Sequence, residues 1–397
     1  MKFATQNLNL MEQKLWNRNY ILVFIGIIFI FCNFYLLLSC MPLAVKDLMK
    51  LSTQEMSWIV SIYSLGIVLT RPISGLVADK IGKQKVAVIS FLLFSICTFI
   101  YLGLNSFYVL ILIRFIHGIT HSIGTTAHAA MAVDFSPKNM KGQGIGYYGL
   151  AMCLAMVIAP ALGLYIVENY SYHLLLIIAT VTGFIGTFTT AFIAKDVVDN
   201  KSKVSFSLKS LIEIKAIPVG LLSLLLSLCY SGIITFIAVY LKEKNIENGS
   251  MYFYVAFAVA MVVSRPFIGK IIDKRGAGFL IYPSLIVLAI GMVCMGITNS
   301  LALVITTGLV LGLSYGCVFP CFQTIAVQSC PPQKSGSAMG TFFLFYDCGF
   351  GLGAILLAKI SVISGYSNMY FIISFIIVLM ILIYAVFNKV KLFKSHS

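Results

Sequence analysis

The chain has 397 residues, of which 60% are hydrophobic and only 10% are charged, so it has too few polar side chains to cover a soluble globule of that size. The sequence therefore predicts a protein that lives in a lipid bilayer. The net charge of +15 does not indicate a nucleic-acid partner, because the basic residues fall in short runs between apolar segments and do not gather on one solvated face.

Apolar segments of membrane-spanning length follow one another along the whole chain. A spanning helix needs about 20 mainly apolar residues. Twelve segments meet this requirement: 20–41, 57–77, 86–104, 108–132, 145–166, 173–194, 218–240, 251–269, 278–297, 301–326, 338–358 and 369–388. The first is longer than the apolar stretch of a signal peptide, roughly 7 to 15 residues, so we expect it to remain as a span. The prediction is an all-α integral membrane protein with twelve transmembrane helices.

The basic residues indicate how these spans are oriented. With the N-terminus inside, 20 of the 28 Lys and Arg residues fall in segments assigned to the inside, five in segments outside and three within spans. Cytoplasmic loops carry an excess of Lys and Arg, so both termini are predicted to be cytoplasmic and the protein to lie in the plasma membrane.

Two stretches of the sequence repeat each other. "RPISGLVADKIG", Arg71–Gly82, and "RPFIGKIIDKRG", Arg265–Gly276, agree at six of twelve positions, including Asp79 and Asp273, and each pair is 194 residues apart. The same offset pairs Pro137 with Pro331, Gly142 with Gly336 and Gly146 with Gly340. The chain is thus predicted to be two six-helix halves, residues 1–194 and 218–397, joined by a polar cytoplasmic linker at 195–217.

The first stretch carries a motif that resembles the motif of a known protein family. Gly75, Asp79, Lys80, Gly82 and Lys83 resemble the signature loop after the second helix of the major facilitator superfamily of secondary transporters, and Asp273 belongs to the degenerate second copy. This resemblance implies two bundles, each of 3+3 inverted repeats, and a gating role for the signature loop. Topology anchoring alone would explain the lysines, but not the spaced glycines and aspartates.

No sequence feature indicates an enzyme. The chain has no G-x-x-x-x-G-K-[ST] phosphate loop, and "HGITH" has Gly118 where a zinc protease has its general base. We therefore expect no cofactor, no metal centre and no ATP hydrolysis. The expected partners are a small-molecule substrate, protons and the lipid bilayer, and the expected state is a monomer.

The fifth span indicates a direction of transport. Its segment "AMVIAPALG" is similar to the family's antiporter motif, with Pro160 and Gly163 in register and Ala155 and Ala159 in place of two glycines. Alanine also allows close helix packing. The alternative is an ordinary span kinked by proline.

Ionisable residues within spans are costly and commonly functional. Arg114, His117, His121 and His128 fall on one stripe of the fourth span, roughly 60° wide. Arg114 and Gly118 match the family motif Arg-x-x-x-Gly, whose arginine is associated with proton transfer. The stripe therefore supplies candidates for proton coupling, although Arg114 could also be structural and hydrogen-bonded to backbone carbonyls.

The only acid well inside a span is Asp347, and it is a further candidate for proton coupling. A buried carboxylate must take up a proton or find a cation, which here could be Arg71 or Arg265. Three polar residues could face a substrate cavity: Asn33, Gln323 and Tyr346. Asn33 and Gln323 could equally bond a neighbouring helix.

The function predicted from the sequence is secondary active transport: a proton-coupled exporter, or antiporter, of a small organic, hydrophobic or amphipathic compound. A second hypothesis is a carrier of an anionic or metal-chelating metabolite, by uptake or export, because of the Arg and His stripe. A sensor or enzyme that borrows the fold is disfavoured, because the sequence shows no extra soluble domain.

Overall fold

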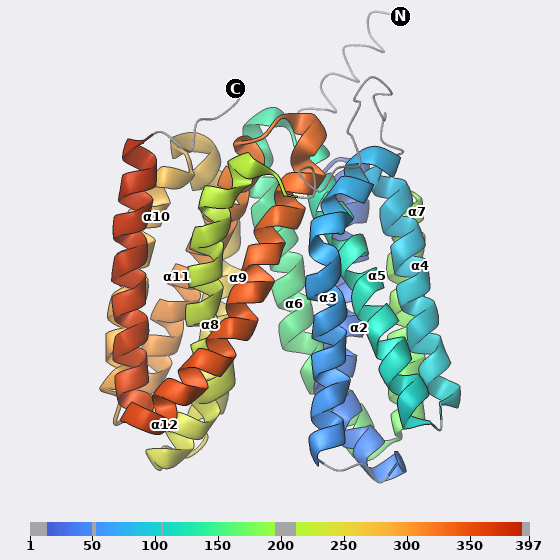
Figure 1. Ribbon diagram of the computed structural model, residues 1–397, viewed down its shortest axis with the longest axis horizontal. Helices are drawn as coiled ribbons and strands as arrows, with labels where there is room; N and C mark the ends of the chain where they lie inside the picture. Colours follow the sequence, from blue (N-terminus) through green and yellow to red (C-terminus); the bar gives the residue numbers. More distant parts are fainter. Residues whose placement is uncertain (1–13, 50–52, 105, 195–211, 391–397) are drawn as a thin grey trace, which may run out of the picture. The chain divides into compact units, whose positions relative to one another are not determined.

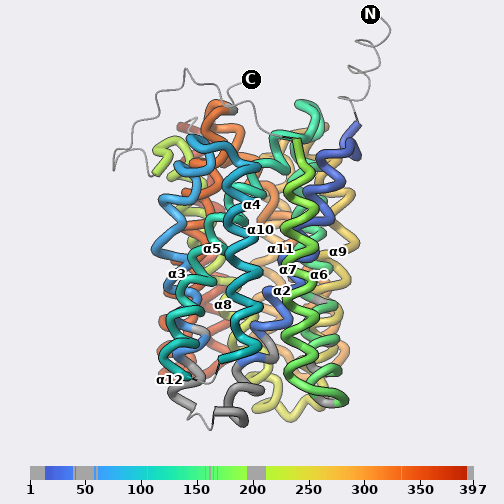
Figure 2. Tube along the Cα trace, turned by 90° about the vertical axis from the view of Figure 1, so that its right-hand side faces the viewer, coloured from blue at the N-terminus to red at the C-terminus, as the bar shows by residue number. Residues whose placement is uncertain are grey.

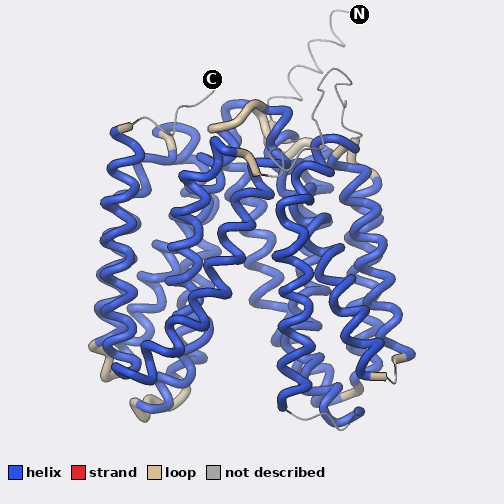
Figure 3. The backbone as a smooth tube through the Cα atoms, viewed as in Figure 1, coloured by secondary structure: helices blue, strands red, loops and turns tan. Residues whose placement is uncertain are grey.

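A computed structural model describes residues 14–49, 53–104, 106–194 and 212–390. In this part of the chain every regular element is a helix and none is a strand (Figures 1 and 3). The elements are α2 Arg18–Met49, α3 Thr53–Ile81, α4 Lys83–Ile100, η1 Tyr101–Gly103, α5 Phe107–Asp134, η2 Lys138–Met140, α6 Lys141–Asn169, α7 Tyr172–Ala191, η4 Ile214–Ala216, α8 Ile217–Glu243, α9 Gly249–Arg275, α10 Ala277–Gly296, α11 Leu301–Gln328, η5 Pro332–Lys334 and α12 Ser335–Lys389.

The number of spans follows from the length of the last helix. Eleven helices in the described ranges are long and apolar enough to cross a membrane. α12 has 55 residues, and at about 1.5 Å per residue it is far too long for one crossing of a hydrocarbon core about 30 Å thick. Its helical geometry breaks at Gly365, where φ is 82° and ψ is 162°. α12 therefore forms two consecutive spans, and the predicted number of twelve is confirmed.

The signature residues do not form the loop that the sequence predicted. Asp79 and Lys80 lie in the last turn of α3, and Lys83 is the first residue of α4. Only Gly82 separates the two helices, with a φ of 105° that side chains with a Cβ rarely allow. Gly276, with a φ of 80°, separates α9 from α10 in the same way. The motif is thus a helix end and a one-residue turn, repeated in both halves.

The fold has two compact units. The start of α12 belongs to unit 1 and the start of α6 to unit 2, whereas the remainder of each helix belongs to the other unit. Unit 1 comprises Met1–Lys138, Ala151–Leu211 and Gln333–Gly340, and unit 2 comprises Asn139–Leu150, Ile212–Pro332 and Thr341–Ser397. The predicted division, 1–194 and 218–397, differs because it keeps the starts of α6 and α12 within their own halves. Most of the predicted linker, residues 195–211, lies outside the described residues.

Helix packing is similar within the two units. In unit 1, α3 makes its most extensive helix contact with α5, while α7 packs beside α2 and α4 (Figure 2). In unit 2, α9 packs against α11, and α11 also packs against α10. Many large apolar side chains remain exposed, such as Phe188 and Leu112. Such a surface suits lipid as the surrounding solvent, and the chain is a multi-pass membrane protein.

The two units repeat a close helix contact. A Cβ added to Gly118 of α5 would overlap the carbonyl oxygen of Tyr63 on α3. A Cβ on Gly312 of α11 would overlap the carbonyl oxygen of Phe257 on α9, and both residues are shifted by 194 positions from the first pair. The internal repeat therefore extends to helix packing, where glycine lets two backbones approach closely.

We expect Gly118→Ala to destabilise the protein by about 1–3 kcal/mol, because the clash is with backbone and cannot be relieved by a rotamer change. Gly351→Ala is the matched control, since a Cβ there meets nothing within 4 Å in the middle of a span. Thermal unfolding of the purified variants in detergent checks both. Equal thermal stability of the two variants would contradict the close contact.

Candidate functional site

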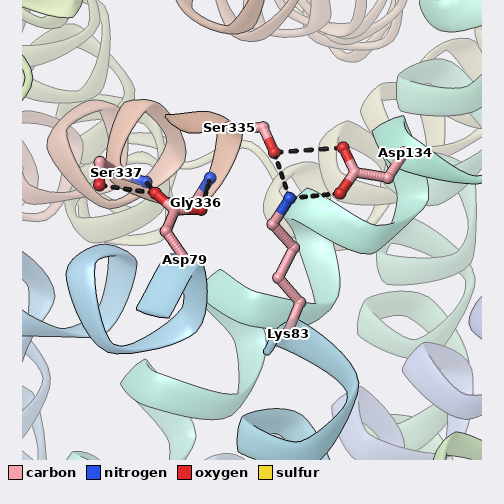
Figure 4. Close-up of polar contacts among 6 residues, drawn as sticks. All are labelled: Asp79, Lys83, Asp134, Ser335, Gly336 and Ser337. Atoms are coloured by element: carbon pink, nitrogen blue, oxygen red, sulfur yellow. Dashed lines mark hydrogen bonds and ion pairs between the residues drawn. The ribbon is translucent and has the colours of Figure 1, made fainter. Parts of the chain in front are cut away.

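Asp79 at the end of α3 caps the start of α12 within unit 1 (Figure 4). Its carboxylate accepts hydrogen bonds from the backbone N–H of Gly336 at 2.9 Å and from that of Ser337 at 2.7 Å. The Ser337 hydroxyl donates a third, at 2.7 Å. The first N–H groups of a helix have no partner within the helix, and its N-terminus carries a partial positive charge, so an anion stabilises it there. We call this contact the Asp79 cap.

The same arrangement, the Asp273 cap, occurs at the start of α6 within unit 2. Asp273 accepts from the backbone N–H of Gly142 at 2.6 Å, and from the backbone N–H and side-chain amide of Gln143, both at 3.0 Å. Acceptor and donors are each displaced by 194 residues from those of the Asp79 cap. The repeat that pairs Asp79 with Asp273 and Gly336 with Gly142 in the sequence therefore also relates two equivalent hydrogen-bonded contacts in the structure.

Glycines bring the capped helices together. A Cβ on Gly75 would overlap the carbonyl oxygen of Gly336, and a Cβ on Gly269 would lie 2.7 Å from the Cα of Gln143. Neither position can hold a side chain without moving the capped helix start. The spaced glycine and aspartate of the motif therefore serve one contact, in which the glycine allows the approach and the aspartate binds the exposed N–H groups.

Unit 1 adds an ion pair beside its cap. Lys83, which is 8% exposed, forms a salt bridge with Asp134 and donates to the Ser335 hydroxyl at 2.7 Å (Figure 4). That hydroxyl donates in turn to Asp134 at 3.1 Å. The positions 194 residues beyond Lys83 and Asp134 are Ala277 and Gln328, so the Asp273 cap lacks this ion pair.

The histidines of α5 face the interior of unit 1. His117 and His121 are 1% and 4% exposed. The Tyr101 hydroxyl lies 2.9 Å from Nδ1 of His117, and the Tyr63 hydroxyl is hydrogen-bonded to Nδ1 of His121. The Phe94 ring packs against both imidazoles, with ring centroids 4.2 and 5.4 Å apart. The stripe is therefore enclosed by α2, α3, α4 and η1, and these side chains are not open to water in this conformation.

Arg114 lies at one end of the same cluster and is 3% exposed. Its guanidinium carbon is 5.3 Å from the centre of the Tyr63 ring and 5.6 Å from that of Tyr101, close enough for cation–π attraction. Its positive charge therefore lies against aromatic rings, and both interpretations of Arg114, proton coupling and a structural role, stay predictions.

Two further candidates are packed between helices of unit 1. His128 is fully buried, and its ring centroid is 5.4 Å from that of Phe91. The Asn33 amide donates to the Ala179 carbonyl at 2.6 Å and to the Thr98 hydroxyl at 3.1 Å. Asn33 therefore matches the alternative in which it bonds neighbouring helices.

The candidates of unit 2 lie beside an aromatic cluster. Tyr346 on α12 is half-buried and its hydroxyl is hydrogen-bonded to that of Tyr315 on α11. The Tyr315 ring stacks on Tyr230 of α8, with ring centroids 4.2 Å apart at 15°. Asp347 follows Tyr346 and is half-buried, while Gln323 is 1% exposed. The role of Asp347, and its suggested ion pair with an arginine, stay predictions.

α6 contains the residues of the antiporter-like segment. Ala155, Ala159 and Gly163 are all buried and lie four residues apart, on one face of the helix. Pro160 is half-buried on α6. Small residues at this spacing are typical of close helix packing, which agrees with both predictions for this span.

Sequence reasoning missed Tyr63 and Tyr101, the partners of the two histidines. No spacing signal could have found them, because tyrosines are frequent in this chain and their partners lie 58 and 16 residues away. It also missed Ser337 and Gln143 as cap donors. Their neighbours Gly336 and Gly142 were already paired by the repeat, and the next position in each half supplies the second donor.

Twelve spans, an internal repeat and two equivalent helix caps define the architecture of a secondary transporter built from duplicated helical bundles. The sequence model described as the Major Facilitator Superfamily matches residues 23–354 and 284–393. The chain belongs to this superfamily, and its members carry small molecules across membranes.

Several proteins are similar to the chain. The staphylopine export protein of Staphylococcus aureus is 23% identical over 340 residues, covering 82% of this chain and 85% of that protein. An uncharacterized MFS-type transporter of Methanocaldococcus jannaschii is 20% identical, covering 75% and 79%. The quinolone resistance protein NorA of S. aureus is 26% identical over 152 residues, which is 38% of this chain and 39% of that one.

Solved structures show the same fold. The human organic anion transporter MFSD10 (TETRAN) superposes with a TM-score of 0.82 at 15% identity, covering 92% of this chain and 98% of that one. The Escherichia coli fucose:proton symporter FucP superposes with a TM-score of 0.75 at 12% identity, covering 93% and 99%.

Proposed function

We propose that the chain is a proton-coupled exporter of small organic compounds of hydrophobic or amphipathic character. It works as an antiporter, in the plasma membrane, as a monomer with both termini cytoplasmic. The observation that carries this proposal is the pair of equivalent caps. Each cap ties the end of one helix to the start of a helix from the other half of the sequence. Contacts of this kind can form and break as a two-bundle transporter changes state.

Export as the direction is supported by the relatives. One is named for the export of staphylopine and another for resistance to quinolones. The orientation is supported by the distribution of Lys and Arg, of which 20 out of 28 fall on the side assigned to the cytoplasm. The antiporter-like face of α6 agrees with this direction.

The substrate class is supported by the aromatic cluster of unit 2. Tyr230, Tyr315, Phe319 and Tyr346 form a continuous set of rings, with neighbouring centroids 4.2 to 6.1 Å apart. Aromatic faces and edges offer a large apolar contact area with polar hydroxyls at their tips. Such a surface suits an amphipathic organic compound.

Proton coupling is supported by ionisable side chains within spans of both units. Asp347 is half-buried in the first span of α12, and Arg114, His117, His121 and His128 are buried in α5. Ionisable groups at such positions commonly belong to proton or substrate pathways.

Transport by everted membrane vesicles tests this function. Vesicles that contain the transporter should accumulate at least one amphipathic dye, from a panel with cationic, neutral and anionic members, against its gradient when their interior is acidified. A protonophore should abolish the accumulation. Vesicles lacking the protein are the control. Accumulation that is indifferent to the protonophore, for every dye of a panel that includes cationic, neutral and anionic members, would contradict proton coupling.

A further inference from the structure

Arg114 is a buried cation, and the structure describes no carboxylate beside it. It is 3% exposed, and its guanidinium lies over the rings of Tyr63 and Tyr101. Nε of Arg114 has no hydrogen-bond partner among the described residues. Burying a charge is costly unless an opposite charge or hydrogen bonds compensate it.

The described acids of unit 1 are already engaged elsewhere. Asp79 binds the start of α12, and Asp134 forms the salt bridge with Lys83. Among the side chains of unit 1 that the structure describes, no other carboxylate is present. The partner of Arg114 is therefore not one of these residues, and its positive charge calls for an anion.

Two imidazole nitrogens beside Arg114 also have no partner. Nε2 of His117 and Nε2 of His121 are buried and have no hydrogen bond in the described part of the chain. Both rings lie near the Tyr63 ring, with centroids 5.4 and 5.8 Å away. The two histidines are one helical turn apart on α5, and Arg114 precedes His117 by three residues, so all three share a face.

The tyrosine hydroxyls determine what the two histidines can offer a ligand. The Tyr101 hydroxyl lies 2.9 Å from Nδ1 of His117, and a hydroxyl that donates to this nitrogen makes it the acceptor. In a neutral imidazole with Nδ1 as acceptor, Nε2 carries the proton. With Tyr101 and Tyr63 as donors, Nε2 of His117 and Nε2 of His121 are both unused N–H donors. Arg114 and the two histidines then present N–H groups and no acceptor.

We propose that Arg114, His117 and His121 bind an anionic group of the substrate, of the carboxylate class. This inference rests on the proposed transport function and narrows its substrate to amphipathic organic anions. A carboxylate supplies the missing negative charge and accepts the unused N–H donors, with charge-assisted hydrogen bonds stronger than neutral ones. Phe94 and the two tyrosines then surround the apolar part next to the charged group.

The internal repeat indicates one such site per chain. The residues 194 positions beyond Arg114, His117 and His121 are Gly308, Leu311 and Tyr315. None of these is a cation or an imidazole, and Tyr315 belongs to the aromatic cluster of unit 2. The anion site is therefore confined to unit 1.

Three ring compounds of one size test the proposal on the purified full-length protein in detergent. Benzoate, benzamide and benzamidine differ chiefly in charge, and their binding is measured by the rise in unfolding temperature and by titration calorimetry. We expect benzoate to bind and the other two to bind at least roughly tenfold more weakly, because they do not supply the anion. Benzoate binding no tighter than benzamide binding overturns the proposal.

Variants assign the effect to the named residues. Arg114→Gln and His117→Gln should each weaken benzoate binding roughly tenfold or more, since each removes a donor to a charged group. Tyr101→Phe keeps the ring and removes the hydroxyl that positions His117, so it should weaken benzoate binding while leaving benzamide binding unchanged. His173→Gln is the matched control, because His173 is exposed at the start of α7. Benzoate affinity unchanged by both Arg114→Gln and Tyr101→Phe rejects the site.

Failure of this inference can be separated from failure of the proposed function. If vesicles show proton-driven transport and benzoate does not bind selectively, only the anion site is rejected. If benzoate binds through Arg114 and no panel dye is driven by a proton gradient, the anion site stands and proton-coupled export is rejected.

Discussion

Replacing Asp347 with asparagine should abolish proton-driven transport and reduce uphill accumulation to the level of vesicles without the protein. Asp347 is the only acid within the twelve spans predicted from the sequence, and it is half-buried in α12. A carboxylate there can take up and release a proton, whereas asparagine has almost the same shape and cannot. Substrate binding and the amount of protein in the membrane should stay unchanged, because the substitution removes a charge without creating a cavity.

Everted vesicles with an imposed proton gradient measure the loss, and the unfolding temperature of the purified variant with and without substrate measures retained binding. Glu243→Gln is the matched control, since Glu243 is exposed at the end of α8 and should transport normally. If Asp347→Asn still moves substrate against its gradient, Asp347 is structural. The coupling group must then be sought among the histidines of α5.

Asp79→Asn should release the start of α12 and lower the rate of transport. The carboxylate of Asp79 accepts three hydrogen bonds from Gly336 and Ser337, two of them from backbone N–H groups at a helix N-terminus. Hydrogen bonds to a charged group contribute about 1.5–3 kcal/mol, so losing the charge should weaken the cap by roughly 10- to 150-fold. A cap this weak would shift the balance between states of the cycle in which it is formed and broken.

Hydrogen exchange measured by mass spectrometry reports directly on the cap. Amides of a peptide that covers Gly336 and Ser337 should exchange roughly 10- to 150-fold faster in Asp79→Asn. Asp273→Asn is the matched variant, because it should accelerate exchange at Gly142 and Gln143 and leave the start of α12 protected. Unaltered exchange at Gly336 and Ser337 in Asp79→Asn would show that the charge does not hold the helix start.

Asp79→Asn and Asp273→Asn should also differ in how much they accelerate hydrogen exchange at the helix start. Next to the Asp79 cap, Lys83 bridges Asp134 and Ser335, and this ion pair still ties Ser335 to unit 1 when Asp79 is neutral. The Asp273 cap has Ala277 and Gln328 at the corresponding positions. The helix start released by Asp273→Asn should therefore exchange faster than the one released by Asp79→Asn.

The twelve spans and the internal repeat could be derived from the sequence, because both depend on local properties of the chain. Hydropathy selects each span independently, since every backbone polar group in a lipid environment must be satisfied within its own helix. The 194-residue offset paired Asp79 with Asp273 before any contact was known. Even the break in α12 was predicted, as a gap between the spans 338–358 and 369–388, and the structure puts it at Gly365.

Only the tertiary structure decided what each polar residue binds. Asp79 finds its donors 257 and 258 residues away, and nothing near it in the sequence identifies Gly336 and Ser337 as its partners. The contacts of Asp79 and Asp273 also explain why the start of α12 belongs to unit 1 and the start of α6 to unit 2. The motif was interpreted as a loop from its resemblance to the signature loop of the family, whereas the structure places Asp79 in the last turn of α3, close to the capped helix start.

The histidine stripe shows the same difference between what the sequence determines and what only the tertiary structure determines. Its spacing on one face of α5 was determined by the sequence, since helical periodicity alone places Arg114, His117 and His121 together. What that face meets depends on how α3 and α4 pack against α5, which brings Tyr63, Phe94 and Tyr101 around the imidazoles. The surroundings of these ionisable side chains are therefore formed by residues of other helices. The sequence therefore determined which ionisable residues share a face of α5, and only the packing decided their partners.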